Sequence, residues 1–429
     1  MSQKLFVLSI DSLFDEDMPF FSTLPNFGKF LKKASFVKGG MRSVYPTLTY
    51  PAHASIITGV YPQSHGIFHN EILDAGNPRP GWYWYRRDMR AETIIDAAKK
   101  AGYSTCCVGW PVMGGCPNTD YLVPEIWPKT ETEDPRSLLL NWGSANVKDI
   151  IERHYHKMRT IHQPFLDFMM TGCAVDIIRK FRPDVTFMHL AHLDHARHEN
   201  GLYGPMVEQA LVLSDDFLGR LMEAACDAGI QDETNFVVSS DHGHLPVKWL
   251  FNPNVLLARK GLVTVDSSGG VRDWKAWCNS AALSCQVVMK DPSDGETRRL
   301  LEDLLYEMRA TREYGVESVF TKEEAQNEWH LAGDFEYVLE GGPAFSFGND
   351  CTGPVLVKPD KSDYKFSVAS HGHLPHKGPQ PVFMMTGPAV KENAVIPRQR
   401  IIDEAPTFAR ILGFTLNQAK GRALEELLK

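Results

Sequence analysis

Three aspartates come at or shortly after the ends of short apolar runs that are typical of buried strands. Asp11 closes the first run, Asp194 follows a second, and the pair Asp241 and His242 follows a third. In open α/β sheets, ligands gather at the carboxyl ends of the strands, so these side chains could meet although they are far apart in sequence. His198 stands four residues after Asp194, a spacing that places both side chains on one face of a helical turn.

Carboxylates and imidazoles in such a set suit a divalent metal ion. His371, which precedes Gly372, adds a further imidazole beside a residue that permits a tight backbone. The mixed ligands favour Zn²⁺, with Mn²⁺ or Fe²⁺ as less suited alternatives. Two such ions can hold a phosphate between them, stabilise the charge of an in-line transition state and lower the pKa of a coordinated hydroxyl.

Thr49 is the candidate nucleophile of the sequence. A threonine hydroxyl is a poor nucleophile unless a metal ion or a base activates it. Pro51 suits the first turn of a helix, and the residues up to Thr58 can continue that helix. Thr49 would then lie at the helix N-terminus, where free N–H groups and the helix dipole attract a phosphate.

Each of these features has an ordinary structural explanation when it is taken alone. An aspartate after a strand is usually a turn or helix cap, and Thr49 could be an N-cap only. Asp194 and His198 could pair on a helix surface. The aromatic segment 82–85 is more often packing than a platform for stacking bases. The metal-site hypothesis therefore rests on the joint occurrence of the features.

Short apolar runs alternate with amphipathic segments along much of the chain. We predict strands at 5–10, 103–108, 184–190 and 235–239, and helices at 24–34, 93–100 and 205–229. This alternation favours an α/β fold with a mostly parallel central sheet and helices on both faces.

The stretch 245–368 has a different character. It carries a Ser-Ser-Gly-Gly turn at 267–270, a predicted strand at 285–289 and a predicted helix at 296–309. We expect a smaller α+β insertion or subdomain here, so that residues 1–244 and 369–429 form the catalytic core. The tail, 401–428, is predicted to be helical and to pack back on the sheet.

Composition limits the classes of partner. The chain has 429 residues, a net charge of −8 and no long Lys/Arg run, which disfavours polymeric nucleic acid but not small anions. Its eight cysteines form no pair of CxxC motifs, as expected for thiols in a reducing compartment. The N-terminal apolar run is too short for a secretion signal, and no stretch of 18 apolar residues predicts a membrane span. We therefore expect a cytoplasmic protein, and the sequence gives no oligomeric state.

The joint pattern resembles the alkaline phosphatase superfamily and, within it, the nucleotide pyrophosphatase/phosphodiesterase branch. The order of motifs is the family's order: an aspartate after the first strand, a threonine followed by an aromatic residue and proline, D-x-x-x-H, S-D-H-G and a later H-G. In this chain they stand as Asp11, Thr49-Tyr50-Pro51, Asp194 with His198, Ser240-Asp241-His242-Gly243 and His371-Gly372. The resemblance covers nearly the whole chain outside 245–368.

The resemblance implies two metal sites and a small phosphate ester as substrate. One site would use Asp194, His198 and His371, and the other Asp11, Asp241 and His242 with Thr49 beside them. Asn70 would donate to a non-bridging phosphate oxygen together with the backbone N–H of Tyr50, whose ring would form part of the leaving-group or base pocket. Attack by Thr49 would give a phospho-threonine intermediate, and the bond cleaved would be a phosphodiester or pyrophosphate bond.

Other activities stay open at this point. Ala52 stands where the family often has asparagine, and the segment after His371 reads Gly-His-Leu-Pro-His, so the nucleotide preference is uncertain. A phosphomonoesterase or phosphonate hydrolase of the same superfamily is the nearest alternative, and Arg42, Arg86, Arg87 or Lys248 could then bind the distal phosphate oxygens. A non-catalytic metal- or phosphate-binding protein and a phosphomutase are further alternatives. The sequence contains no C-x-P-x-R segment, which would be expected in a sulfatase.

Overall fold

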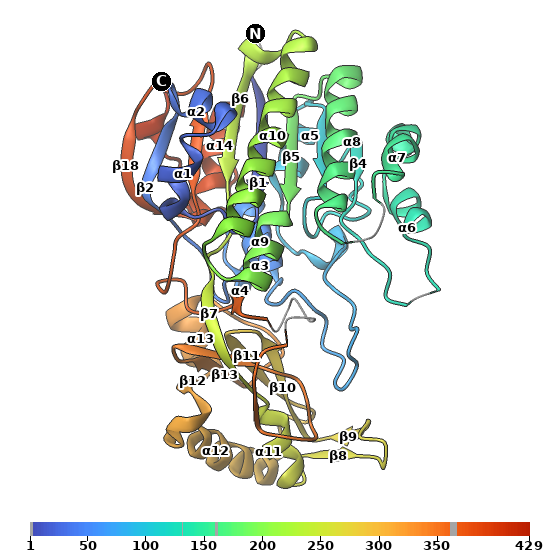
Figure 1. The fold of residues 1–429 in the computed structure, drawn as a ribbon, viewed down its shortest axis with the longest axis vertical. Helices are drawn as coiled ribbons and strands as arrows, with labels where there is room; N and C mark the ends of the chain where they lie inside the picture. The colour runs from blue at the N-terminus through green and yellow to red at the C-terminus, as the bar shows by residue number, and fades with distance from the viewer. Residues whose placement is uncertain (1–2, 131, 159–161, 361–366) are drawn as a thin grey trace.

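The computed structural model describes residues 3–130, 132–158, 162–360 and 367–429. Its largest element is an eight-stranded sheet with the order β18-β2-β17-β6-β1-β5-β3-β4 (Figure 1). Seven strands run in one direction, and only β17 is antiparallel to its neighbours β2 and β6. The strands are β1 (Lys4–Ile10), β2 (Ser35–Arg42), β3 (Thr105–Val108), β4 (Tyr121–Val123), β5 (Val185–Leu190), β6 (Thr234–Ser239), β17 (Phe383–Thr386) and β18 (Val395–Arg400).

Helices cover both faces of this sheet because successive side chains of its central strand point to opposite sides. Leu5 and Val7 of β1 pack in the hydrophobic core under α3, α5 and α14, whereas Phe6 and Leu8 pack in the core under α2, α8 and α10. The bounds of these helices are α2 (Pro25–Leu31), α3 (Thr49–Thr58), α5 (Ile94–Lys100), α8 (Phe165–Phe181), α10 (Pro205–Asp227) and α14 (Glu404–Leu412). The predicted α/β fold with a mostly parallel sheet is confirmed.

Shorter helices complete the core around the sheet. They are α1 (Met18–Phe21), α4 (Pro62–His65), α6 (Pro135–Trp142), α7 (Lys148–Tyr155) and α9 (His192–Asn200). No helix among the described residues is long and apolar enough to cross a membrane.

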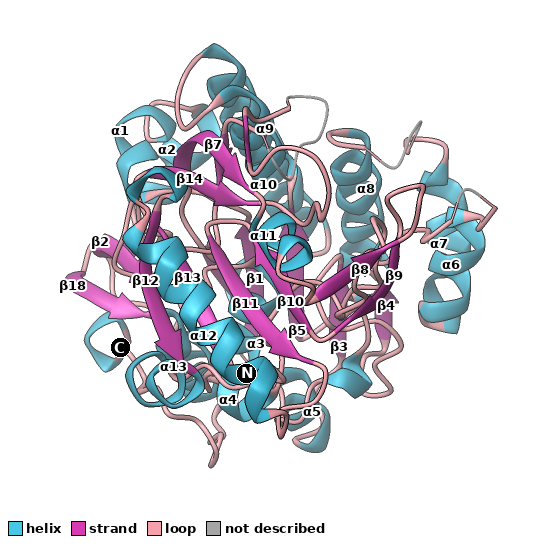
Figure 2. Ribbon diagram, turned by 90° about the horizontal axis from the view of Figure 1, so that it is seen from below, coloured by secondary structure: helices cyan, strands magenta, loops and turns pink. Residues whose placement is uncertain are grey.

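A second lobe lies at one end of the central sheet, below it in the view of Figure 1 and in front of it in Figure 2. Its antiparallel sheet has the order β10-β11-β13-β12, with α12 packed on it, and β7 pairs with β14, β15 and β16 beside it. The strands are β7 (Leu245–Phe251), β8 (Val263–Val265), β9 (Val271–Trp274), β10 (Ala276–Ala281), β11 (Ser284–Met289), β12 (Val316–Thr321), β13 (Tyr337–Gly341), β14 (Ala344–Phe347), β15 (Leu356–Val357) and β16 (Ala369–Ser370). The helices are α11 (Pro253–Arg259), α12 (Gly295–Ala310) and α13 (Lys322–Trp329).

The sequence predicts that residues 245–368 form an α+β insertion or subdomain. Residues 245–368 contain the strands and helices of the second lobe apart from β16, but whether they form an independent domain stays a prediction.

The C-terminal tail differs from the prediction. A helix was expected throughout 401–428, but α14 ends at Leu412, and Ile401–Asp403 and Glu425–Leu427 form only short 3₁₀ turns. Gly413 explains the stop, since its φ of 81° is the left-handed conformation that commonly ends a helix.

Candidate active site

The parallel pairing of three strands brings the predicted aspartates together. β1 lies between β5 and β6 in register, so the carboxyl ends of all three strands meet at one edge. Asp11 directly follows β1, Asp241 comes two residues after β6, and Asp194 lies in the first turn of α9, which follows β5. All three side chains are buried.

Asp11, Asp241 and His242 form one candidate metal cluster, with possible ligand atoms that all lie within 4.8 Å of one another. The Nε2 atom of His242 is 3.5 Å from Oδ1 of Asp11 and 3.1 Å from Oδ2 of Asp241. The structure thus joins residues that are 230 positions apart in the way that the sequence predicted.

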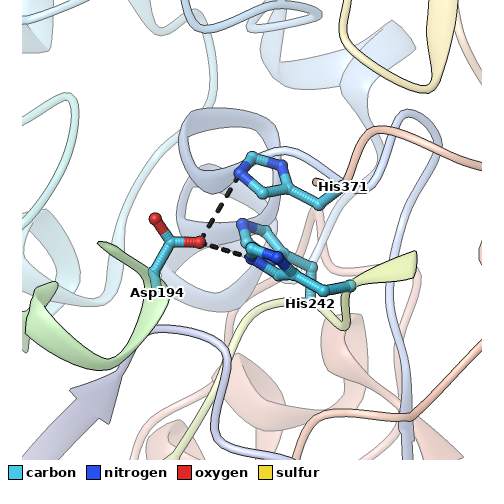
Figure 3. A group of neighbouring side chains, drawn as sticks. Asp194, His242 and His371 are labelled. Carbon is cyan, nitrogen blue, oxygen red and sulfur yellow. Dashed lines mark hydrogen bonds and ion pairs between the residues drawn. The ribbon is translucent and has the colours of Figure 1, made fainter. Parts of the chain in front are cut away.

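Asp194 is the centre of a second cluster, which contains His242, His244 and His371. Figure 3 shows the Asp194 carboxylate facing His371 and His242, which come from separate segments of the chain. His371 Nε2 lies 3.6 Å from Oδ1 of Asp194, and His198 Nε2 lies 3.4 Å from Oδ2. The two clusters adjoin because His242 belongs to both.

The hydrogen bonds of two histidines favour a cation between them and Asp194. Nδ1 of His198 lies 2.8 Å from the carbonyl oxygen of Ala369, and Nδ1 of His371 lies 3.1 Å from that of Thr47. A carbonyl only accepts, so each Nδ1 carries the ring proton, and a neutral ring then turns a bare Nε2 lone pair toward the carboxylate. Second-sphere bonds of this kind fix the orientation of metal-ligating histidines.

The electrostatics of the clusters lead to the same conclusion. Burial and the nearby Asp194 raise the pKa of Asp11 well above its usual value, and burial and Asp11 do the same to the pKa of Asp241. Burial lowers the pKa values of His242 and His371 well below the usual value, so both rings are neutral. Crowded carboxylates beside neutral imidazoles fit two divalent cations, which would restore the carboxylates to their charged form.

Thr49 lies at the point where the two clusters adjoin. It is the first residue of α3, and its Oγ1 is 3.2 Å from Nε2 of His242. The predicted phosphate-binding pair is also together: the backbone N–H of Tyr50 donates to Oδ1 of Asn70 over 2.9 Å. This bond fixes the amide of Asn70 so that its NH₂ group remains available as a donor beside the helix N-terminus.

A cavity of about 270 Å³ opens beside the clusters. Its wall includes Thr49, Asn70 and the clustered residues Asp11, Asp194, His198 and His371, together with the aromatic rings of Tyr50, Trp82 and Trp127. Among the described residues that line it there is no arginine or lysine. Arg42, Arg86, Arg87 and Lys248, the cations considered from the sequence, are not on this wall.

Sequence reasoning missed several side chains around the clusters. Nε2 of His244 lies 2.7 Å from Oδ1 of Asp194, and His189 Nε2 lies 3.1 Å from Oδ2 of Asp11. Behind His189 is Glu125, whose pKa is raised to about 7 by burial. The only sequence signal was the spacing of His244, two residues after His242 in a loop that follows a strand.

Two adjoining aspartate–histidine clusters lie at the edge of an α/β sheet, beside a threonine at a helix N-terminus. This arrangement fits the class of proteins that hold a binuclear metal site. Residues 5–372 match the family model described as type I phosphodiesterase/nucleotide pyrophosphatase. The chain therefore belongs to that family, and the resemblance noted from its motifs is confirmed.

Individual relatives agree with this membership. Rat ectonucleotide pyrophosphatase/phosphodiesterase family member 1 is 28% identical over 228 residues, which are 53% of this chain and 21% of the relative. The venom phosphodiesterase of Macrovipera lebetinus is 27% identical over 226 residues, 52% of this chain and 23% of the relative. The alignments thus span less than a quarter of the length of these relatives.

Solved structures share the fold. Murine ectonucleotide pyrophosphatase/phosphodiesterase 5 superposes with a TM-score of 0.69 at 17% identity, and the match covers 100% of both chains. An inactive threonine-to-alanine variant of the same murine protein, in complex with AMP, also gives a TM-score of 0.69, at 18% identity and with 100% of both chains covered.

Proposed function

We propose that this chain is a metal-dependent hydrolase that cleaves phosphodiester or pyrophosphate bonds in small nucleotide-type substrates. The observation that carries the proposal is the position of Thr49, at the N-terminus of α3 and in contact with the histidine that both clusters share. Family membership and the AMP complex of the murine relative support a nucleotide as the substrate.

Two groups of side chains would hold the divalent ions. Asp194, His198 and His371 would bind one, with His244 against the same carboxylate, and Asp11, Asp241 and His242 would bind the other next to Thr49. The ions, with Zn²⁺ favoured by the mixed nitrogen and oxygen ligands and Mn²⁺ as the alternative, would lower the pKa of the threonine hydroxyl and offset negative charge on the phosphate.

The remaining chemistry belongs to the chain's own residues. The Thr49 oxygen attacks phosphorus, the bond from phosphorus to the leaving oxygen breaks, and water later hydrolyses the phospho-threonine. The NH₂ group of Asn70, oriented by the bond from the Tyr50 N–H, donates to a non-bridging oxygen, where negative charge develops in the transition state. The Trp82 and Trp127 rings offer stacking faces at the cavity wall, and the buried Tyr50 ring packs edge to face on Trp82.

The lining of the cavity favours a diester over a monoester. A terminal phosphate dianion carries one more charge than a diester, and arginine or lysine side chains commonly bind the additional oxygens. The described wall offers aromatic rings and no such cation. A phosphate with two organic substituents therefore fits this wall better than the phosphomonoester alternative.

Parallel assays with bis(p-nitrophenyl) phosphate and p-nitrophenyl phosphate test the proposal. Metal-loaded protein should hydrolyse the diester faster, and a chelator should abolish turnover. Thr49→Ala should lower kcat by on the order of 10³-fold or more with unchanged metal content by elemental analysis, whereas Thr49→Ser keeps a hydroxyl and should keep part of the activity. Preference for the monoester, or full activity in Thr49→Ala, would overturn the proposal.

A further inference from the structure

Asn70, the proposed donor to the non-bridging oxygen, lies in an irregular segment between α4 and the 3₁₀ turn Arg86–Asp88. A donor of this kind lowers the barrier only if it is already in place before charge develops on the phosphate. An irregular segment has few regular backbone hydrogen bonds to hold it, so other contacts must position the Asn70 amide.

The ring of His69 encloses the backbone of Asn70. Its Nδ1 accepts the N–H of Glu71 over 2.9 Å, so the side chain before Asn70 bonds to the backbone after it. Its Nε2 lies 3.0 Å from the carbonyl oxygen of Ser280. Because a carbonyl only accepts, Nε2 carries the ring proton and Nδ1 is left as the acceptor. The ring is therefore neutral, and both of its nitrogens bond to the backbone of the protein.

Two further bonds restrict Asn70 itself. The N–H of Tyr83 donates to the carbonyl oxygen of Asn70 over 3.0 Å, and the N–H of Tyr50 donates to Oδ1 of Asn70 over 2.9 Å. Both oxygens of Asn70 thus accept bonds from the protein. The NH₂ group is the part of Asn70 that the proposed mechanism uses at the cavity wall.

The bond to Ser280 connects this segment to the second lobe. Ser280 belongs to β10, which pairs with β11 along its whole length. On β11, Nε2 of Gln286 donates to the carbonyl oxygen of Phe68 over 2.7 Å. The two residues before Asn70, Phe68 and His69, are therefore bonded to adjacent strands of the second lobe.

His65 makes the same local bond without the contact to the second lobe. Its Nδ1 accepts the N–H of Ile67 over 3.1 Å, which is also two residues further along the chain. Its Nε2 lies 2.9 Å from Oγ of Ser55 in α3, so this ring bonds to the catalytic core. His65 and His69 are both buried, with 0% and 2% of their surface exposed. A change at His65 therefore measures the general effect of losing a buried histidine in this segment.

We propose that His69 is a positioning residue that holds Asn70 in place for the transition state and connects it to strand β10 of the second lobe. The inference rests on the proposed function, in which Asn70 donates to a non-bridging oxygen. Because both ring nitrogens bond to the backbone, His69 acts through Asn70 and not on the substrate. The second lobe then contributes to catalysis, since β10 helps to determine where the Asn70 amide lies.

A double-mutant cycle between His69 and Asn70 tests the inference, with bis(p-nitrophenyl) phosphate and metal-loaded protein. His69→Phe removes both bonds and keeps a ring. It should lower kcat by about 10- to 100-fold and change KM by less than about 3-fold, because the misplaced donor acts in the transition state. Asn70→Ala should lower kcat by on the order of 10²- to 10³-fold. The double variant should match Asn70→Ala, because the position of the donor has no effect once the donor is absent.

The matched control is His65→Phe, whose effect on kcat, if any, should multiply with that of Asn70→Ala. Multiplicative losses for His69→Phe and Asn70→Ala, or a wild-type kcat in His69→Phe, would overturn the inference. Elemental analysis should find the same metal content in all of these variants. If His69→Phe does not fold by circular dichroism, His69→Asn replaces it in the cycle, because it keeps an acceptor for the Glu71 N–H.

Failure of the inference and failure of the proposed function give different results. Full activity in Asn70→Ala would overturn only the inference, because there would be no donor for His69 to position. No hydrolysis of the diester by the wild type would count against the proposed function. The same cycle is then measured by calorimetric titration with AMP, whose phosphate can accept from Asn70. Non-additive losses of binding free energy support the inference, and additive losses or no binding by the wild type contradict it.

Discussion

Arg197 stabilises the backbone at Ser12, between the two candidate metal clusters. Its removal should lower both the stability of the fold and the affinity for metal. The side chain is fully buried, its guanidinium pairs with the buried Asp17 carboxylate, and its Cζ lies 3.7 Å from the Phe14 ring centroid. Its Nε donates to the carbonyl oxygen of Ser12 over 3.0 Å. Ser12 has a φ of 59°, an unfavourable conformation for this residue type that persists only when neighbours hold it.

Ser12 in turn connects the two clusters. Its backbone N–H donates to Oδ1 of Asp241 over 3.3 Å, and its hydroxyl donates to Oδ1 of Asp194 over 3.2 Å. A change at Arg197 should therefore affect the candidate metal ligands Asp194 and Asp241 through Ser12.

The expected magnitude follows from these contacts. Arg197→Met leaves the Asp17 carboxylate buried and unpaired, which should lower the free energy of unfolding by about 3–5 kcal/mol. Asp17→Asn with Arg197→Met removes both charges, and the double variant should be more stable than the sum of the single effects by about 2–3 kcal/mol. Loss of the Ser12 anchor should weaken metal binding by about 10- to 100-fold.

Urea unfolding of chelator-treated protein measures the stability, and competition with a chromophoric chelator measures metal affinity. Arg220→Met is the matched control, because the Arg220–Asp216 pair is 3.8 Å apart and partly exposed on α10. That control should cost no more than about 1 kcal/mol. A loss below about 1 kcal/mol in Arg197→Met, or strictly additive effects in the double variant, would refute the reasoning.

Three further changes probe the clusters and the second lobe. Asp241→Asn should lower metal occupancy by elemental analysis, because a neutral amide is a poorer ligand than a carboxylate. His244→Ala should weaken metal retention by about 10- to 100-fold in a chelator competition assay, because it removes the group that bonds to the Asp194 carboxylate. Burial raises the pKa of Glu340 to about 7 although Lys377 opposes the shift. This folded-state pKa lies above the unfolded value of about 4.5, so protonation of Glu340 stabilises the folded protein. That contribution is fully present below pH 4.5 and is lost as the pH rises through 7. Relative to Glu340→Gln, the wild type should therefore lose about 3 kcal/mol of unfolding free energy over that interval.

Each of these tests has a clear contrary outcome. Unchanged occupancy in Asp241→Asn would remove Asp241 from the site. His376 stacks on Trp329 outside the clusters, so equal effects of His376→Ala and His244→Ala would show a general loss of stability. A stability difference between wild type and Glu340→Gln that is constant with pH would show that Glu340 does not titrate in this range.

The candidate site was predictable to the extent that local sequence determined it. Asp11 and Asp241 follow runs that have the length and polarity of buried strands. Ligand sites generally lie at the edge where the parallel strands of an α/β sheet end. Thr49 was placed by Pro51 and the helical segment after it. His244 was missed because nothing local distinguishes an imidazole that reaches a carboxylate 50 positions away.

The order of the strands was beyond prediction for a similar reason. Nothing in the sequence of Phe383–Thr386 indicates that β17 runs against seven parallel strands, because pairing depends on long-range contacts. Most strands of the second lobe were also not predicted. Its strands are short and separated by turns, so periodicity revealed only the segment 285–289 and the helix 296–309.

The position of β17 has a consequence for how the protein is made. β17 lies between β2 and β6, so these two strands have no partner on that side until the ribosome has produced residues near position 386. Until then the backbone N–H and C=O groups along that edge of each strand are unpaired, and for β2 this lasts for more than 300 residues of synthesis. Exposed edges of this kind invite pairing between different chains. Ribosome-bound intermediates that stop before β17 should therefore need chaperones far more than the finished chain, in which β17 covers the facing edges of both β2 and β6.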